Sequence, residues 1–403
     1  MYYLWTRLPL ILLFLNGYVI YRVLVVTKLT DVFVLRGLQK SRGSLNRLCL
    51  YIIVVSAVLS FFIPNAITVL IMLPVLKTVE QDIALKTSEY SITTALTLSV
   101  IYGANIGGMG SLIGSPANLL LIGALDLYQV PGREQISFLN WFIWSVPLVA
   151  GFLAAAYLIV SCQLPVVSGQ LPVATDNGQR TTDNRQILAG RVFIFFLAFW
   201  IIESVLKELI PGFGPLEPPL CILFFIFFLH LVFIRPLGRY HGPLLCLTDI
   251  FTGFPKRGIL FLCLLGVIIS LVRIFQIDKW ASVLLSDALR AEMSVSAIIF
   301  TIIIAVIFLT ELLSNTVVST AFFSISYFIA VDHSIHPLIL MIAVSAASTC
   351  AFMTPIATPC NALAFGEMKG TSFPRMLISG FLLNIIGAGL MTLWLQFVIP
   401  IVY

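Results

Sequence analysis

The chain has 403 residues, of which 60% are hydrophobic and only 10% are charged. Soluble proteins average roughly 25% charged residues, so this composition excludes a soluble enzyme, a disordered chain and a nucleic-acid-binding protein. It predicts instead an all-α polytopic protein embedded in the lipid bilayer. The seven cysteines are scattered without CxxC or Cys/His spacing, which argues against a disulfide framework or a zinc site.

Six long apolar stretches predict helices that cross the bilayer, since a crossing helix needs about 20 apolar residues. They lie at 4–25, 138–162, 188–210, 218–236, 258–276 and 373–400. Basic residues concentrate in the linkers on one side of these helices, which predicts that this side is cytoplasmic. The basic linkers are 27–47, 77–89, 163–187, 235–257 and 366–375. Segment 28–47 also has apolar residues between its basic ones and predicts an amphipathic helix at the membrane interface.

Two further apolar stretches predict re-entrant hairpins. Segment 48–76 is interrupted near its centre by Pro64-Asn65, and segment 294–330 by Ser314-Asn315-Thr316. Each arm would be roughly 20–24 Å long at 1.5 Å per residue, which is too short to cross the membrane separately. Asn65 and Asn315 would lie at the hairpin tips, where the second arms begin.

Two other stretches predict broken helices. Segment 91–125 contains NIGGMGSLIGSPAN and segment 338–365 contains FMTPIATPCN, so Gly, Pro and small hydroxyl residues lie at mid-membrane depth. Irregular backbone is tolerated there only when it is buried in protein or lines a water-filled cavity. Ser115-Pro116 and Thr358-Pro359 have the pattern of a helix N-cap followed by the first helical residue. Each predicts the start of a half-helix, whose free N–H groups and roughly half a positive charge attract anions.

These features occur twice in the same order. Asn65 corresponds to Asn315 at an offset of 250 residues, and SPAN at 115–118 corresponds to TPCN at 358–361 at an offset of 243. Gly17 likewise corresponds to Gly266, and Ser137-Phe138 to Ser372-Phe373. Because the hairpins do not cross, the two halves would have inverted topology, an arrangement typical of secondary transporters. The predicted division is a first inverted repeat at 1–162, a cytoplasmic linker at 163–187, two additional scaffold helices at 188–236 and a second inverted repeat at 255–403.

The SNT motif at 314–316 and the two [ST]P-x-N motifs resemble those of the divalent anion/sodium symporter family, which belongs to the ion-transporter superfamily of citrate, arsenite and related permeases. The resemblance covers about residues 8–400 and is closer in the second half, where TELLSNT (310–316) and FMTPIATPCNALAFG (352–366) carry it. It implies a secondary active transporter that couples a small anion, either a di- or tricarboxylate or an inorganic oxyanion, to sodium. It also implies an elevator motion, a homodimer and a place in the cell membrane.

The resemblance further implies two sodium sites beside one anion site. The first sodium would be near Ser60, Asn65 and the Gly114 carbonyl, and the second near Thr310, Asn315 and the Ala357 carbonyl. The substrate carboxylates would meet Asn65, Ser115, Pro116, Asn315, Thr316, Thr358 and Pro359. Asn118 and Asn361 would support the half-helices by capping or cross-linking them, or else contact the substrate.

The chain departs from the family pattern at the first tip, which reads Pro64-Asn65-Ala66 where the family has Ser-Asn-Thr. Two hydroxyls are missing there, which leaves a proton-driven oxyanion or arsenite exporter as an alternative. An integral-membrane enzyme is a remote alternative, because it would need titratable groups that converge at one depth. Glu311 lies in an apolar hairpin arm, where a carboxylate is costly, so it either holds the tip by hydrogen bonds or takes part in ion coupling.

Overall fold

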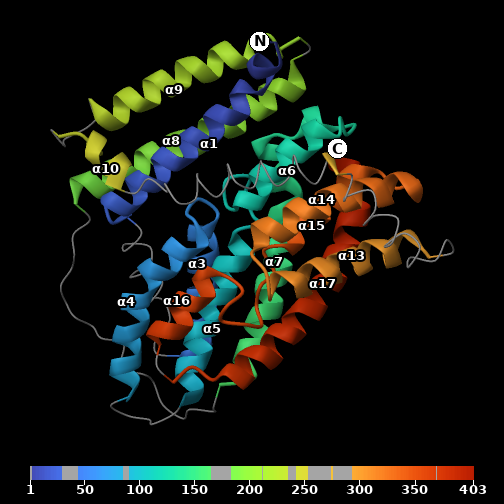
Figure 1. Ribbon diagram of the computed structural model, residues 1–403. Coiled ribbons are helices and arrows are strands. Elements are labelled where there is room, and N and C mark those ends of the chain that lie inside the picture. The colour runs from blue at the N-terminus through green and yellow to red at the C-terminus, as the bar shows by residue number, and fades with distance from the viewer. Residues whose placement is uncertain are drawn as a thin grey trace. The chain divides into compact units, whose positions relative to one another are not determined.

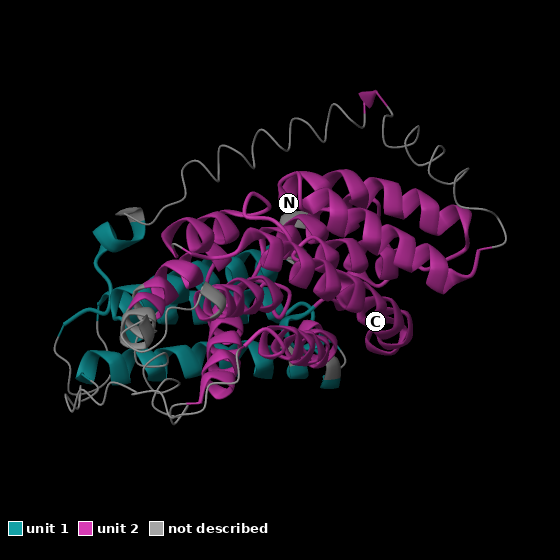
Figure 2. Ribbon diagram, turned by 90° about the horizontal axis from the view of Figure 1, so that it is seen from below, with its two compact units in different colours: residues 1–36, 137–140, 174–256 teal, residues 37–136, 141–173, 257–403 magenta. Residues whose placement is uncertain are grey.

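The computed structural model describes residues 2–29, 44–84, 90–164, 183–210, 212–234, 242–252, 274–275, 293–368 and 370–403. Within these ranges every regular element is a helix, as the apolar composition predicts (Figure 1). The interfacial helix expected at 28–47 and the crossing helix expected at 258–276 fall almost entirely outside the described residues. The chain divides into two compact units, which are coloured separately in Figure 2.

Unit 1 comprises residues 1–36, 137–140 and 174–256. Its helices pack through aromatic rings, and those of Phe199 and Phe224 are stacked with their centroids 3.6 Å apart. Lys207 Nζ lies 3.1 Å from Glu217 Oε1 and pairs the two charges. The described helices of this unit are α1 (Tyr2–Val26), α8 (Asn184–Leu209), α9 (Glu217–Phe233) and α10 (Leu247–Thr252).

Unit 2 comprises residues 37–136, 141–173 and 257–403 and contains both predicted hairpins and both predicted broken helices. Its helices from the first half of the chain are α3 (Leu45–Ser60), α4 (Asn65–Ala84), α5 (Tyr90–Gly107), α6 (Pro116–Leu127) and most of α7 (Phe138–Ser161), with the short 3₁₀ helix η1 (Arg133–Gln135). Those from the second half are α13 (Val295–Thr310), α14 (Asn315–Asp332), α15 (Pro337–Ala347), α16 (Pro359–Glu367) and α17 (Phe373–Val402).

The helix starts recur at the spacings of the predicted internal duplication. The arms α3 and α4 begin 250 residues before α13 and α14, and α6 begins 243 residues before α16. The long helices α7 and α17 begin at Phe138 and Phe373, the positions paired by the sequence. The inverted orientation of the two halves stays a prediction, because the first helix of the second repeat is not described.

Close packing inside unit 2 depends on small residues. Gly103 and Gly107 lie four residues apart on α5, and α3 packs closely against them. A Cβ atom on Gly107 would lie 2.7 Å from the Cα of Ala57, so a larger residue would force the two helices apart. Such small-xxx-small contacts are typical of helices packed within membranes.

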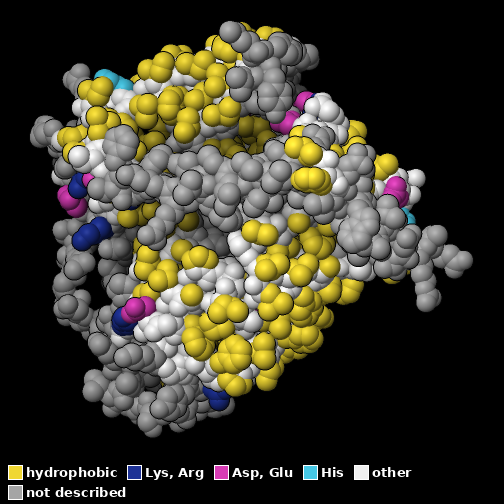
Figure 3. Space-filling model, viewed as in Figure 1, with side chains coloured by type: hydrophobic (Ala, Val, Ile, Leu, Met, Phe, Trp, Pro, Cys, Tyr) yellow, Lys and Arg dark blue, Asp and Glu magenta, His cyan; other side chains and the backbone are white. Residues whose placement is uncertain are grey.

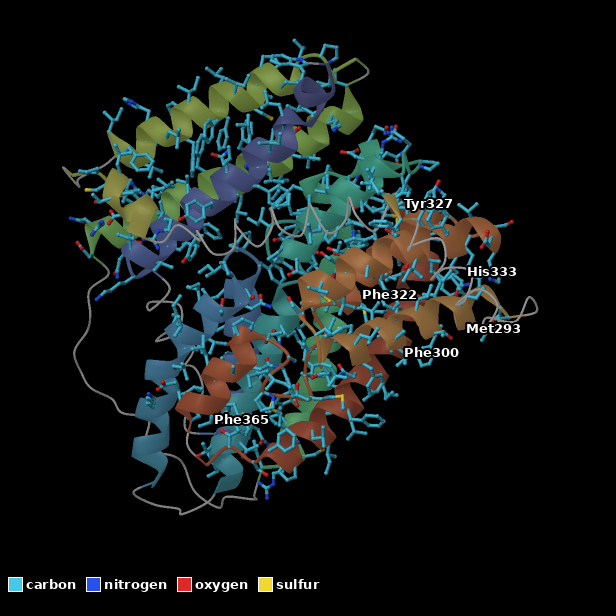
Figure 4. All side chains as sticks on the ribbon, in the orientation of Figure 1. Met293, Phe300, Phe322, Tyr327, His333 and Phe365 are labelled. Carbon is cyan, nitrogen blue, oxygen red and sulfur yellow. The ribbon has the colours of Figure 1, made fainter. Side chains whose placement is uncertain are left out.

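Within unit 2, helices of the first half of the chain pack against helices of the second half. The second arm of each hairpin packs against the half-helix of the opposite repeat, α4 against α16 and α14 against α6. Lys77 on α4 forms an ion pair with Glu367 at the end of α16, at 2.5 Å. The ring of Tyr327, which is labelled on α14 in Figure 4, stacks on Tyr128 at the end of α6 with the centroids 4.5 Å apart.

The described helices fit a bilayer by length and composition. Four are long and apolar enough to cross a membrane, at Leu8–Val26, Phe138–Ser161, Asn184–Lys207 and Phe373–Val402. Large apolar side chains are exposed on them, for example Leu158 at 61% and Ile378 at 62%, and Figure 3 shows few charged groups on the face it views. One crossing helix, predicted at 218–236, is shorter than expected. Its helix α9 has 17 residues, from Glu217, with Pro218 in the first turn, to Phe233.

The hairpin arms are also apolar helices, but their lengths differ from the prediction in one place. Helix α4 continues to Ala84, eight residues beyond the apolar stretch. The arms α3 and α13 have 16 residues each, which at 1.5 Å per residue is about 24 Å. The re-entrant path of both hairpins stays a prediction.

A paired amide and half-helix site

The interruptions predicted in α5–α6 and α15–α16 are confirmed. Ser115 is the N-cap of α6, with its hydroxyl accepting from the Ala117 N–H at 3.3 Å, and Pro116 is the first helical residue. Thr358 caps α16 in the same way, accepting from the Asn361 N–H at 3.1 Å, and Pro359 follows it. Ser115, Pro116, Thr358 and Pro359 therefore occupy two helix N-termini, each with the positive end of the helix dipole.

The side chains of Asn118 and Asn361 hydrogen-bond to the irregular backbone of the two breaks. The Nδ2 of Asn118 donates to the backbone oxygens of Ser111 at 2.8 Å and Gly108 at 3.4 Å. The Nδ2 of Asn361 donates to those of Thr354 and Ala351, both at 2.8 Å. Because Ser111 and Gly108 correspond to Thr354 and Ala351 at the 243-residue offset, the two asparagines have the same structural role. They satisfy carbonyl groups that the broken helices leave without partners.

The two breaks lie next to each other. Asn105, near the end of α5, donates from its Nδ2 to Asn361 Oδ1 and to the Ala351 oxygen, both at 2.9 Å. In the opposite direction, Ser345 on α15 donates to Asn118 Oδ1 at 2.8 Å. Side chains of each repeat thus hydrogen-bond to the half-helix of the other. The adjacency on which the predicted anion site depends is present within unit 2.

At the first tip, two of the three predicted sodium ligands contact each other. Ser60 Oγ donates to Asn65 Oδ1 at 2.6 Å, and Gly114 lies near them, since a Cβ atom built on it would lie 3.1 Å from the backbone oxygen of Ser60. Gly108 also approaches Asn65, since a Cβ there would lie 2.9 Å from Oδ1. Asn65 Nδ2 points the other way and donates to Asn105 Oδ1 at 3.3 Å. The tip thus brings together a hydroxyl and an amide oxygen, which are ligands suited to a hard cation.

The second tip differs. Asn315 begins α14, and its Oδ1 is buried without a hydrogen-bond partner among the described residues. Thr310 Oγ1 donates to the Ile307 oxygen at 2.8 Å within its own helix. No hydrogen bond in the described part of the chain joins Thr310, Asn315 and Ala357 to one another. A buried oxygen without a donor costs free energy, which a cation would offset by binding to it.

Glu311 links the second tip to the second break. Its Oε1 accepts from the N–H groups of Phe352 at 2.7 Å and Met353 at 2.8 Å, and its Oε2 from that of Thr354 at 2.9 Å. Asn384 on α17 adds a fourth hydrogen bond at 3.1 Å. The carboxylate is only 3% exposed, and these donors compensate its burial. These hydrogen bonds fit the first of the two roles that the sequence left open, and a part in ion coupling stays a prediction.

Sequence reasoning missed several residues of this network. Asn105 was part of a recognised motif, but nothing in the sequence indicated that it meets Asn361. Trp141 and Ser145 on α7 donate to the oxygens of Met109 at 3.0 Å and Gly110 at 2.9 Å, and so support the first break. In the sequence they appear only as a Trp and a Ser four residues apart at the start of an apolar helix. This pattern is common in packed helices, so it does not indicate contact with a broken helix.

The electrostatics of the site come from dipoles. Stretches 91–125 and 338–365 contain no charged residue, and neither hairpin tip carries Lys or Arg. Positive potential is supplied by the N-termini of α6 and α16, with asparagine amides beside them. Groups of this kind bind small anions at the helix N-termini and hard cations at the oxygens.

Comparison with known proteins identifies the family of this chain. A citrate transporter family model matches residues 3–236, which is more than half of the sequence. The chain belongs to the citrate transporter family. It is also 27% identical to a sodium-dependent dicarboxylate transporter of Staphylococcus saprophyticus, an alignment that covers 97% of this chain and 76% of the relative. The corresponding transporter of Staphylococcus aureus is 28% identical, with 98% of this chain and 77% of the relative covered.

Membership in the citrate transporter family, together with the apolar helices, establishes an integral multi-pass protein of the cell membrane. The chain is a secondary transporter of anions and not an enzyme, which excludes the membrane-enzyme alternative. The predicted divalent anion/sodium symporter resemblance is confirmed at the level of the family.

Proposed function

We propose that this protein moves a small dicarboxylate across the cell membrane together with sodium ions. The observation that carries the proposal is the cross-linking of the two breaks by Asn105 and Ser345, which brings two half-helix N-termini into one site. The Staphylococcus relatives are sodium-dependent dicarboxylate transporters and match nearly the whole chain. Two positive helix ends suit a substrate with two negative charges better than one with a single charge.

The anion is held between the hairpin tips and the half-helix starts. The first carboxylate is bound by Asn65, Ser115 and Pro116, and the second by Asn315, Thr316, Thr358 and Pro359. In this arrangement backbone N–H groups, hydroxyls and amides donate to the substrate, without a buried Arg or Lys. The second half of the site offers more donors, since Thr316 has a hydroxyl where the first tip has Ala66.

Sodium is the co-substrate in this proposal and binds at two places. The first place is formed by Ser60, Asn65 and the Gly114 oxygen, and the contact between the Ser60 and Asn65 side chains supports it. The second is formed by Thr310, Asn315 and the Ala357 oxygen, and the buried, unpartnered Asn315 Oδ1 supports it. Cation and anion neutralise each other in the low-dielectric interior, so each favours binding of the other.

Transport follows an elevator-type motion in a homodimer. Both hairpins and both broken helices belong to unit 2, so the entire proposed site can move as one body. The helices α1, α8 and α9 belong to unit 1 and supply the scaffold. The homodimer is the assembly that the family resemblance implies.

The test is uptake by proteoliposomes that contain the purified protein. Labelled dicarboxylates, a tricarboxylate, sulfate and arsenite are offered in turn, each with an inward sodium gradient and with an inward proton gradient. We expect sodium-driven uptake that is largest for a dicarboxylate. Movement of an oxyanion that depends on the proton gradient and ignores sodium would contradict the proposal and favour the exporter alternative.

A further inference from the structure

We infer that Asn105 is a positioning residue that fixes the orientation of the Asn65 amide, and thereby aims Asn65 Oδ1 at the first sodium position. The inference rests on the proposed function, because it assigns a role within that sodium site. It is carried by a chain of four polar side chains that runs from the first hairpin to the second broken helix. The chain consists of Ser60, Asn65, Asn105 and Asn361.

An asparagine amide has an acceptor end and a donor end, and the hydrogen bonds around it decide which end points where. The orientation of the Asn361 amide is fixed, because its Nδ2 must face two backbone oxygens, those of Ala351 and Thr354. Its Oδ1 must therefore point toward Asn105. Backbone carbonyls accept and never donate, so they fix the direction of the whole chain.

The same argument passes along the chain. Asn105 meets two acceptors, Asn361 Oδ1 and the Ala351 oxygen, so its Nδ2 must face them and its Oδ1 must face Asn65. Asn65 then directs its Nδ2 to Asn105 at 3.3 Å and its Oδ1 to Ser60 at 2.6 Å. Thus the oxygen of Asn65, rather than its NH₂ group, lies beside Ser60.

Burial makes this arrangement costly to break. The side chains of Asn105, Asn361 and Ser60 are fully buried, so solvent cannot replace a partner lost at any of these three, and Asn65 is half-buried. Without Asn105, the Nδ2 of Asn65 has no acceptor in the chain of amides. The Asn65 amide can then turn over and present NH₂ hydrogens, which repel a cation, to the sodium position.

The second repeat supplies a matched control. Ser348 corresponds to Asn105 at the 243-residue offset, and it is also fully buried. Its hydroxyl donates to the Ser345 oxygen of its own helix at 2.8 Å and makes no described bond to the other repeat. A substitution there removes a buried polar group near the breaks without touching the chain of amides.

The experiment measures sodium binding by thermal unfolding of the purified full-length protein in detergent. Sodium chloride is titrated against choline chloride at constant ionic strength for Asn105→Ala, Asn105→Leu and Ser348→Ala. The Leu variant keeps the side-chain volume and guards against a cavity effect. We expect both Asn105 variants to raise the half-saturating sodium concentration by about tenfold, the loss expected for one misdirected buried polar group, and Ser348→Ala to leave it unchanged.

A double-mutant cycle tests whether Asn105 acts through Asn65. On an Asn65→Ala background, Asn105→Leu should produce no further rise in the half-saturating sodium concentration. Folded Asn105 variants with wild-type sodium binding would overturn the role of Asn105, and so would independent, additive effects in the cycle. A wild-type protein that sodium does not stabilise at all would instead contradict the proposed sodium coupling, so the two failures are distinguishable.

Discussion

Phe61 and Glu311 occupy equivalent positions, one residue beyond the ends of α3 and α13, and the backbone oxygen of each is tied to the break of its own repeat. Ser111 donates its hydroxyl to the Phe61 oxygen, and Thr354 donates its hydroxyl to the Glu311 oxygen at 3.0 Å. Glu311 adds a carboxylate that binds three backbone N–H groups, whereas Phe61 places its ring beside Gly110. Each predicted hairpin is therefore hydrogen-bonded to the broken helix of its own repeat, and the second makes more of these hydrogen bonds.

This relationship predicts that Glu311 stabilises the second tip. Glu311→Gln replaces one acceptor oxygen by a donor that faces backbone N–H groups, so the free energy of unfolding should fall by about 1–3 kcal/mol. The measurement is the thermal unfolding midpoint of the purified protein. Glu367→Gln is the control, because its ion pair with Lys77 is about half exposed and should contribute less than about 1 kcal/mol. Equal midpoints for both variants would contradict the anchoring role.

Gly108 is predicted to be required because Asn65 fills the space beside it. A Cβ atom on Gly108 would lie 2.9 Å from Asn65 Oδ1 and 3.1 Å from Nδ2, so Gly108→Ala should displace the amide and sharply reduce sodium-dependent uptake. Gly123→Ala on α6 is the matched control, since nothing lies within 4 Å of the added carbon there. Uptake by both variants at the wild-type rate would show that the position of Asn65 does not matter for transport.

Asn315 is predicted to serve function at the expense of stability. Its buried Oδ1 has no hydrogen-bond partner in the described structure, so Asn315→Ala should abolish uptake without lowering the unfolding midpoint measured in the absence of sodium. Ser319→Ala is the control, because among the described residues the Ser319 hydroxyl bonds only to the Asn315 backbone oxygen in the same helix, at 2.7 Å. Retention of full uptake by Asn315→Ala would remove this residue from the site.

We predict that Ala66 lowers the affinity of the site for one of the two substrate carboxylates. It follows Asn65 at the first tip as Thr316 follows Asn315 at the second, and it lacks the hydroxyl. Ala66→Thr should therefore lower the KM for a dicarboxylate, by about tenfold for one added hydrogen bond to a charged group. Steady-state uptake at saturating sodium gives the KM, and Thr316→Ala should raise it. An unchanged KM in Ala66→Thr would show that the first tip does not meet the carboxylate.

Local chemistry explains what the sequence predicted. Ser115-Pro116 and Thr358-Pro359 start helices because a hydroxyl caps free N–H groups and proline needs no hydrogen bond at the first helical position. The tips at Asn65 and Asn315 followed from interruptions in apolar runs. These features depend on residues within a few positions of one another, so a single sequence contains them.

The contacts that assemble the site depend on distant parts of the chain. Asn105 and Asn361 are 256 residues apart, and their hydrogen bond requires the packing of α16 against α5. Glu311 was left between two roles because most of its donors are backbone N–H groups of residues 352–354, and a sequence does not show which side chain a backbone N–H group will meet. The length of α4 was underestimated for a different reason. Its last turns contain polar and charged residues, so the apolar run ends before the helix does.

The most direct test of the account is accumulation of a labelled dicarboxylate in proteoliposomes that contain the wild-type protein. An inward sodium gradient is compared with equal sodium on both sides and with choline in place of sodium. The account predicts transient accumulation above the external concentration with the gradient, equilibration with equal sodium, and background uptake with choline. Uptake of the same rate and extent under all three conditions would contradict it.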